Sequence, residues 1–217
     1  MLSKHENAPP AARDVIGGTP LFGLFNKLAL SAQEADSFAV ELIAPQRGAG
    51  VSAIARALAR CAAANMDGPV LLVRADPAAT GPTGTSSLAE LHHRGADLRE
   101  AARPDGEDGL WHAMLMQAAP GKTPAPLPLG VLDKIVTRLR ASYRWIVFDS
   151  VPPQDSSFGL ILSRFMNGTV VVAEAERTRL PSARQLVLQI RANGGTPIGF
   201  VVNKRRKVIP DFIYRFL

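Results

Sequence analysis

The chain has 217 residues, of which 47% are hydrophobic and 20% charged, enough for one α/β domain with a substantial core. Its net charge of +6 would attract nucleic acid, anionic lipid or an acidic protein surface without choosing among them. A lone cysteine excludes an intramolecular disulfide, no apolar run approaches the ~20 residues that span a bilayer, and the N-terminus lacks the apolar centre of a signal peptide; the sequence is therefore interpreted as cytoplasmic.

The first third of the chain predicts a helix, a strand, a glycine-containing loop and a second helix. Residues 1–20 hold several prolines and glycines and are interpreted as a flexible N-terminal arm, and residues 21–32 as the first helix. The apolar run 38–43 predicts a strand. The alanine-rich residues 52–64, with apolar side chains at helical spacing, predict the helix that follows the loop.

Strands and helices alternate through the rest of the chain. The predicted strands are 70–73, 110–116, 145–148, 169–173 and 198–202, and the predicted helices lie near 86–94, 131–141 and 181–193. Continuous Val/Ile/Leu strands separated by helices indicate a parallel sheet covered on both faces. We therefore expect a doubly wound, mostly parallel α/β domain over residues 21–205, followed by a basic and aromatic tail, 206–217.

Residues 44–53, Ala-Pro-Gln-Arg-Gly-Ala-Gly-Val-Ser-Ala, occupy the place of a phosphate-binding loop between a strand and a helix. In such a loop, backbone N–H groups point at phosphate oxygens, a lysine reaches the phosphates and a Ser or Thr hydroxyl holds Mg²⁺. Gly48, Gly50 and Ser52 fit this pattern, but Val51 stands where the lysine is required. A tight turn before a helix would explain the same residues, so the loop alone leaves both interpretations open.

Three further segments follow the loop in a specific order. Residues 70–76 end in Arg-Ala-Asp, residues 145–153 in Phe-Asp-Ser-Val-Pro-Pro, and residues 198–203 in Val-Val-Asn. With the loop, these segments resemble the MinD/ParA-like P-loop ATPases, and particularly the cytoplasmic kinase domains of bacterial tyrosine autokinases that accompany exopolysaccharide chain-length regulators. The resemblance implies the P-loop fold, an asparagine near the adenine and ATP-dependent tyrosine phosphorylation.

Residues that would neutralise nucleotide charge depart from the family pattern. The departures are Val51 for the Walker A lysine, Gln46 for a second, signature lysine, Arg47 for a glycine or proline, Arg74 for the first aspartate of an Asp-x-Asp pair, and Val151 inserted into the Asp-Ser-Pro-Pro turn. Losing a direct phosphate cation costs several kcal/mol, and ~4 kcal/mol corresponds to about 10³-fold in rate. Normal turnover is therefore not expected.

The resemblance implies a vestigial nucleotide site. Its cofactor-binding residues would be Arg47, Gly48, Gly50, Val51, Ser52, Arg74 and Asn203. Asp76 and Asp149 would be the catalytic carboxylates, and they would hold Mg²⁺ with Ser52 if nucleotide binds. The expected cofactor is none, or weakly bound ATP or ADP with Mg²⁺. An arginine, Arg47 or Arg74, could replace the missing cation because a guanidinium binds phosphate well.

The C-terminal tail begins with the densest basic run of the chain and continues with aromatic and apolar residues. A solvated turn followed by a segment folded onto the core explains this pattern. A docking element for a membrane surface or a membrane-protein partner also explains it, since apolar anchors beside cations combine burial with attraction to anionic headgroups. The docking residues would be Lys204, Arg205, Arg206, Lys207, Phe212, Tyr214 and Phe216. The autokinases carry a tyrosine cluster in this tail, whereas here Tyr214 is the sole candidate acceptor, and an apolar anchor is its favoured role.

Three functional hypotheses remain open. The favoured one is a degenerate tyrosine-kinase-like pseudokinase or pseudo-ATPase that regulates an inner-membrane exopolysaccharide chain-length or export co-polymerase and is held peripherally at the membrane by that partner. The second is an active, unconventional ATPase or tyrosine autokinase for exopolysaccharide biosynthesis. The third is a MinD/ParA-like positioning protein that binds membrane or DNA, with nucleic acid the least favoured partner. The resemblance also implies association into homo-oligomers.

Overall fold

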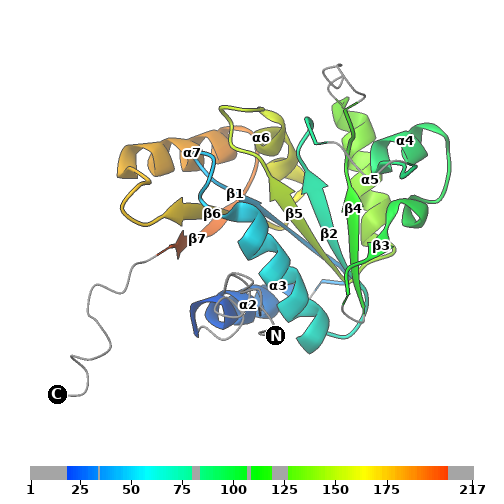
Figure 1. The fold of residues 1–217 in the computed structure, drawn as a ribbon, viewed down its shortest axis with the longest axis horizontal. Helices are drawn as coiled ribbons and strands as arrows, with labels where there is room; N and C mark the ends of the chain where they lie inside the picture. Colours follow the sequence, from blue (N-terminus) through cyan, green and yellow to red (C-terminus); the bar gives the residue numbers. More distant parts are fainter. Residues whose placement is uncertain (1–18, 34, 80–83, 107–108, 119–126, 205–217) are drawn as a thin grey trace, which may run out of the picture.

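Seven strands form a single sheet in the described part of the chain, which comprises residues 19–33, 35–79, 84–106, 109–118 and 127–204 of this computed structural model (Figure 1). The strand order is β3-β4-β2-β5-β1-β6-β7, and every pairing is parallel except that of β3 with β4. The strands are β1 (Phe38–Ile43), β2 (Val70–Ala75), β3 (Arg103–Pro104), β4 (Leu110–Met114), β5 (Trp145–Ser150), β6 (Gly168–Glu174) and β7 (Pro197–Asn203).

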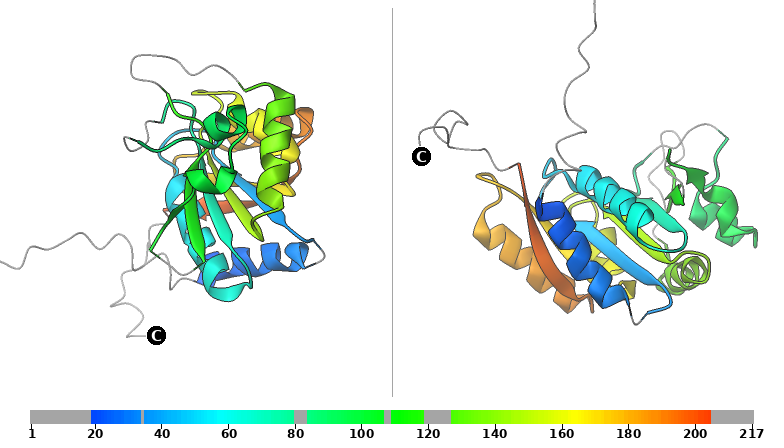
Figure 2. Two further views of the ribbon diagram at one scale, coloured as in Figure 1. Left: turned by 90° about the vertical axis from the view of Figure 1, so that its right-hand side faces the viewer. Right: turned by 90° about the horizontal axis from the view of Figure 1, so that it is seen from below.

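Helices cover both faces of the sheet, which confirms the predicted doubly wound α/β fold. One face packs against α2 (Thr19–Ala32) and α3 (Val51–Asn65). The other packs against α4 (Leu88–His93), α5 (Leu129–Arg140), α6 (Phe158–Leu162) and α7 (Leu180–Ala192), with short 3₁₀ turns at Leu98–Ala101 and Ser163–Phe165. The right-hand view of Figure 2 shows α2 and α3 on one side of the sheet and α5 and α7 on the other.

The two faces follow from the side-chain alternation of the strands. In β1, Val40 and Leu42 face α2 and α3, whereas Ala39 and Ile43 face the opposite helices. Trp145 is fully buried at the start of β5, and its ring lies 5.8 Å from that of Phe25 in α2. Burial of an aromatic pair of this size fixes α2 against the sheet.

Element boundaries differ from the predictions by a few residues. α2 begins at Thr19, because Pro20 suits the first turn of a helix, so part of the predicted N-terminal arm is helical. The strand predicted at 110–116 ends at Met114, where it leaves β2, its parallel partner. β3 and α6 were not predicted, since runs of two and five residues carry no periodicity. Within the described residues, no helix is long and apolar enough to cross a membrane.

The order of the strands positions the site. β1 lies between β5 and β6, and the chain leaves β1 directly into the loop that precedes α3. In open parallel sheets, ligands bind outside the carboxyl ends of the strands at the point where the strand order reverses. The loop after β1 and the acidic ends of β2 and β5 meet at that point (Figure 1).

Candidate functional site

The loop after β1 has the backbone geometry of a phosphate cradle. Gly48 and Gly50 adopt left-handed conformations with φ of 85° and 90°, and Gly50 is the N-cap residue of α3. A Cβ on Gly50 would lie 2.2 Å from the side-chain nitrogen of Asn203, so this position requires glycine. The N-terminus of α3 therefore opens into the loop, where free N–H groups and the helix dipole favour an anion.

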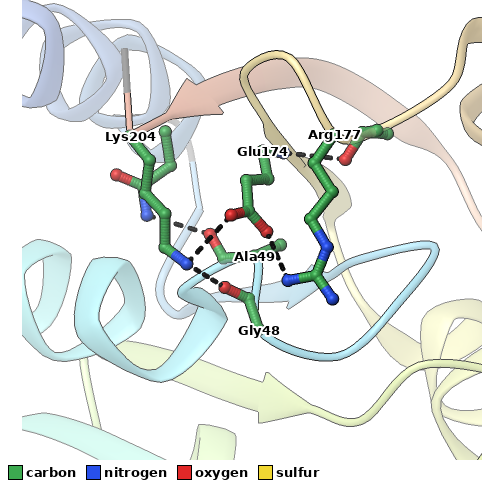
Figure 3. A network of polar contacts seen from close by, with 7 residues as sticks. Gly48, Ala49, Glu174, Arg177 and Lys204 are labelled. Atoms are coloured by element: carbon green, nitrogen blue, oxygen red, sulfur yellow. Dashed lines mark hydrogen bonds and ion pairs between the residues drawn. The ribbon is translucent and has the colours of Figure 1, made fainter. Parts of the chain in front are cut away.

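Side chains at the end of β7 donate hydrogen bonds to the backbone of this loop (Figure 3). Asn203 Nδ2 donates a hydrogen bond of 2.9 Å to the Ala49 carbonyl, and Lys204 Nζ donates one of 2.6 Å to the Gly48 carbonyl. Lys204 Nζ also lies 3.1 Å from Glu174 Oε1. These bonds use loop carbonyls and leave the loop N–H groups to a ligand.

Glu174, at the end of β6, forms ion pairs with two cations beside the loop. Its Oε2 atom is 3.3 Å from Arg177, and its Oε1 atom contacts Lys204. The hydrogen bond from Lys204 is the main reason that the pKa of Glu174 lies below its usual range. Arg177 and Lys204 therefore reach the loop already paired with a carboxylate (Figure 3).

At the start of the loop, Arg47 is also paired with a carboxylate. Its Nε atom lies 2.7 Å from Asp155 Oδ2, in the turn that follows β5, and this contact raises the pKa of Arg47. The neighbouring Gln154 donates a hydrogen bond of 3.3 Å to the Pro45 carbonyl. The turn that contains the inserted Val151 thus closes against the start of the loop.

The acidic end of the site lies on β2 and β5. Arg74 and Asp149 are register partners on these adjacent strands, and Arg74 lies 3.7 Å from Asp76 Oδ2. Burial raises the pKa of Asp149, while a hydrogen bond from the Ser52 side chain opposes that shift. The aspartates and Ser52 line a cavity of about 460 Å³ with Arg74 and the loop.

The structure brings most of the predicted site residues together. The cavity is lined by Arg47, Gly48, Gly50, Val51, Ser52, Arg74, Asp76 and Asp149. Asn203 lies beside the loop and bonds its backbone. Lys204 contacts the loop and Glu174, whereas the other predicted docking residues, Arg205, Arg206, Lys207, Phe212, Tyr214 and Phe216, lie outside the described residues.

Val51 is the decisive residue in this cavity. Its side chain is 9% exposed and belongs to the apolar cluster beneath α3. It lines the cavity at the first helical position, immediately before Ser52. An aliphatic side chain therefore stands at the first position of α3, where the resemblance predicts a lysine.

Sequence reasoning missed Glu41, a fully buried carboxyl behind the site. Ser150 Oγ donates a hydrogen bond of 2.6 Å to Glu41 Oε1, and Thr169 Oγ1 donates one of 3.3 Å to Glu41 Oε2. Burial raises the pKa of Glu41 to about 8 despite these two bonds. Glu41 thus links β1, β5 and β6 mainly as a neutral acid. The only signal in the sequence is one charged residue within the apolar run Phe-Ala-Val-Glu-Leu-Ile.

The donor groups fit a phosphate in shape, but they do not fit the charge of a triphosphate. Ser52, Asp76 and Asp149 are oxygen donors of the kind that Mg²⁺ prefers. Around the loop, however, the described cations are already engaged by protein carboxylates: Arg47 by Asp155, Arg74 by Asp76, and Arg177 and Lys204 by Glu174. Each pair would have to be broken or shared before its cation could neutralise a nucleotide.

Comparisons with known proteins place this arrangement among P-loop folds. The kinase domain of the Escherichia coli tyrosine kinase ETK superposes with a TM-score of 0.74 at 15% identity, over 88% of this chain and 76% of that one. The VpsO kinase domain gives 0.70 at 21% identity, over 87% and 95%. MinD from Pyrococcus horikoshii, complexed with Mg-ADP, gives 0.54 at 14% identity, over 83% and 76%.

No protein-family model matches the sequence, and no curated protein matches it. The similarity is one of fold: the chain has the α/β fold of P-loop NTPases, as seen in the bacterial tyrosine kinase domains and the MinD and ParA ATPases. This likeness confirms the predicted resemblance at the level of architecture.

Proposed function

We propose that the chain is a pseudokinase or pseudo-ATPase that acts as a cytoplasmic partner and regulator of an inner-membrane exopolysaccharide co-polymerase. The observation that carries this proposal is the state of the phosphate loop, in which Val51 takes the place of the catalytic lysine and the neighbouring arginines are paired with protein carboxylates. A triphosphate site needs free cations, because phosphoryl transfer depends mainly on electrostatic stabilisation.

The same contacts support a scaffold role. The pairs at Arg47 and Glu174 connect the loop to the turn after β5 and to the ends of β6 and β7, whereas Arg74 and Asp76 pair within the end of β2. A domain whose site is closed by its own ion pairs presents one surface to a partner at every nucleotide concentration. The fold of tyrosine kinase domains makes a membrane-protein partner of the polysaccharide pathway the favoured one, with peripheral attachment through that partner.

A binding experiment tests the proposal. The purified chain is mixed with the detergent-solubilised co-polymerase from the same cell, without nucleotide, with Mg-ADP and with Mg-ATP, and the complex is measured by co-purification and by interferometry. We expect a complex of equal affinity in all three conditions. Val51→Lys is the matched control, because it restores the missing cation and leaves the outer surface unchanged. Absence of a complex in every condition would remove the main support for the proposal.

A second candidate is an unconventional ATPase or tyrosine autokinase. It is favoured by the bond from Ser52 to the partly buried Asp149, and by the position of Arg47 and Arg74 on the cavity wall. Release of inorganic phosphate from ATP that is lost in Asp149→Ala and kept in Asp133→Ala, an exposed position on α5, would establish this function. Equal release by both variants would exclude this site as its source.

A further inference from the structure

Positive charge is concentrated in the segment that runs from the turn before α7 to the end of β7. Residues 177–204 include no aspartate or glutamate and five cations, Arg177, Arg179, Arg184, Arg191 and Lys204. Arg177 and Lys204 are paired with Glu174. The other three arginines are exposed, and none of them forms an ion pair with a described residue. Arginines at the phosphate loop and around α4, by contrast, have carboxylate partners.

Exposed leucines lie among these arginines on α7. Leu180 and Leu188 are 61% and 63% exposed. Because they are separated from Arg184 and Arg191 by three or four residues, all four side chains share one face of the helix. The buried face of α7 is formed by other positions, Ala183, Leu186 and Ile190. The solvent-facing side of α7 therefore carries leucine and arginine in alternation.

A polar cavity shows which way this face of α7 turns. Ser182, Gln185 and Gln189, on another flank of the helix, line a cavity of about 220 Å³ with Pro45 and Gln154. Pro45 follows β1 and Gln154 follows β5, and both strands lie on one side of β6, whereas β7 lies on the other side. The face with the leucines and arginines points away from this cavity, so it turns outward and toward β7.

Two side chains of β7 extend this surface. Phe200 and Val202 are 55% and 54% exposed. Their register partners are Val171 and Ala173, and Val171 packs against α7, so Phe200 and Val202 lie on the side of the sheet that α7 covers. The right-hand view of Figure 2 shows β7 beside α7. Cations and large apolar groups thus occupy one continuous surface at this edge of the domain.

We propose that this α7–β7 surface docks on an anionic phospholipid bilayer. Its contacts would be made by Arg179, Arg184 and Arg191 with headgroup phosphates, and by Leu180, Leu188 and Phe200 with the boundary of the acyl chains. Guanidinium groups bind phosphate well, and apolar side chains beside cations combine burial with attraction to anionic headgroups. Neither nucleotide nor the co-polymerase is required for this contact.

The exposed apolar groups favour a bilayer over a nucleic acid. A DNA backbone would pair with the arginines, but it would leave the leucines and Phe200 in water. A bilayer offers phosphates and an apolar boundary within the same few ångströms of depth, which matches a surface that carries both kinds of side chain. Each cation near an anionic membrane strengthens binding by about fivefold, so the three arginines together contribute about 100-fold.

Vesicle sedimentation tests the docking. The purified chain is mixed at low salt with vesicles of equal parts phosphatidylglycerol and phosphatidylcholine, and with vesicles of phosphatidylcholine alone. The test variant combines Arg179→Gln, Arg184→Gln and Arg191→Gln. The matched control combines Arg94→Gln, Arg99→Gln and Arg103→Gln, which remove the same charge at and before β3, the other terminal strand.

We expect the natural chain and the control to bind the anionic vesicles, and the test variant to bind them about 100-fold more weakly. Equal binding by the two variants, equal binding of the natural chain to anionic and neutral vesicles, or binding to neither would overturn the proposal. A DNA duplex that binds more tightly than the vesicles, with the same loss in the test variant, would assign the surface to nucleic acid and would also overturn it.

Tryptophan emission tests the apolar contact separately. Leu188→Trp places an indole ring on the exposed face of α7, and Leu30→Trp is the matched control, because Leu30 is 66% exposed on α2, across the sheet. Anionic vesicles should shift the emission of Leu188→Trp to shorter wavelength and leave that of Leu30→Trp unchanged. No shift for Leu188→Trp, or the same shift for both, would contradict docking through α7.

Discussion

The buried carboxyl of Glu41 makes the stability of this domain depend on pH. Glu41→Gln keeps the size of the side chain, and it retains groups that can bond the hydroxyls of Ser150 and Thr169. The substitution removes the carboxyl group that can ionise. We expect the variant to be more stable than the natural protein at alkaline pH and about equally stable near pH 4.5.

The magnitude follows from the shift of the Glu41 pKa from 4.5 to about 8 on folding. Because the folded value is raised, the folded state keeps its proton between these two pH values while the unfolded state loses it. Stability therefore falls as pH rises through this window, by about 1.4 kcal/mol for each pH unit. At pH 7.5 the accumulated loss is at most about 4 kcal/mol, and Glu41→Gln should recover most of it.

Urea unfolding of both proteins at several pH values between 5 and 8 measures this difference. Other titrating groups contribute to both proteins alike, so the difference between their unfolding free energies isolates Glu41. A difference that grows with pH would agree with a neutral carboxyl in the folded state. A constant difference across the range would refute it. It would mean that the Glu41 carboxyl is ionised in the folded state to the same extent as in the unfolded state.

Three substitutions test the packing and pairing around the site. Gly159→Ala should lose about 1–3 kcal/mol in urea unfolding, because its Cβ would lie 2.9 Å from Ile43 Cδ1; unchanged stability would show that α6 moves freely. Arg74→Ala should change the same free energy by less than about 1 kcal/mol, since its ion pair is half exposed, and a larger loss would reveal a tighter contact. Asn203→Ala removes the bond to the Ala49 carbonyl and should cost about 1 kcal/mol and speed hydrogen exchange in residues 46–50; unchanged exchange would argue against a fastened loop.

The architecture could be predicted because local patterns specify it. Continuous aliphatic runs identified the buried parallel strands, and glycines before an alanine-rich segment located the loop and α3. These signals lie within ten or so residues of one another. β3 and α6 escaped prediction because their form depends on neighbours distant in the chain: β3 on β4, and α6 on the site face of β1.

The charge pairing of the site could not be predicted from the sequence. Arg47 and Asp155 lie far apart in the chain, and Lys204 is 156 residues from the Gly48 carbonyl that it contacts. Their partnerships arise only when the ends of β1, β5, β6 and β7 meet. The sequence indicated that a lysine was missing, whereas the engagement of the remaining cations by carboxylates required the fold.

Calorimetry tests most directly whether this phosphate loop lacks the cations needed to bind a nucleoside triphosphate. The purified chain and Val51→Lys are titrated with ATP, with and without Mg²⁺. We predict no binding in the micromolar range for the natural chain and a gain of binding for the variant, whose lysine would reach the cavity. Micromolar binding of Mg-ATP by the natural chain would contradict it, and would mean that Arg47 or Arg74 leaves its carboxylate to serve the nucleotide.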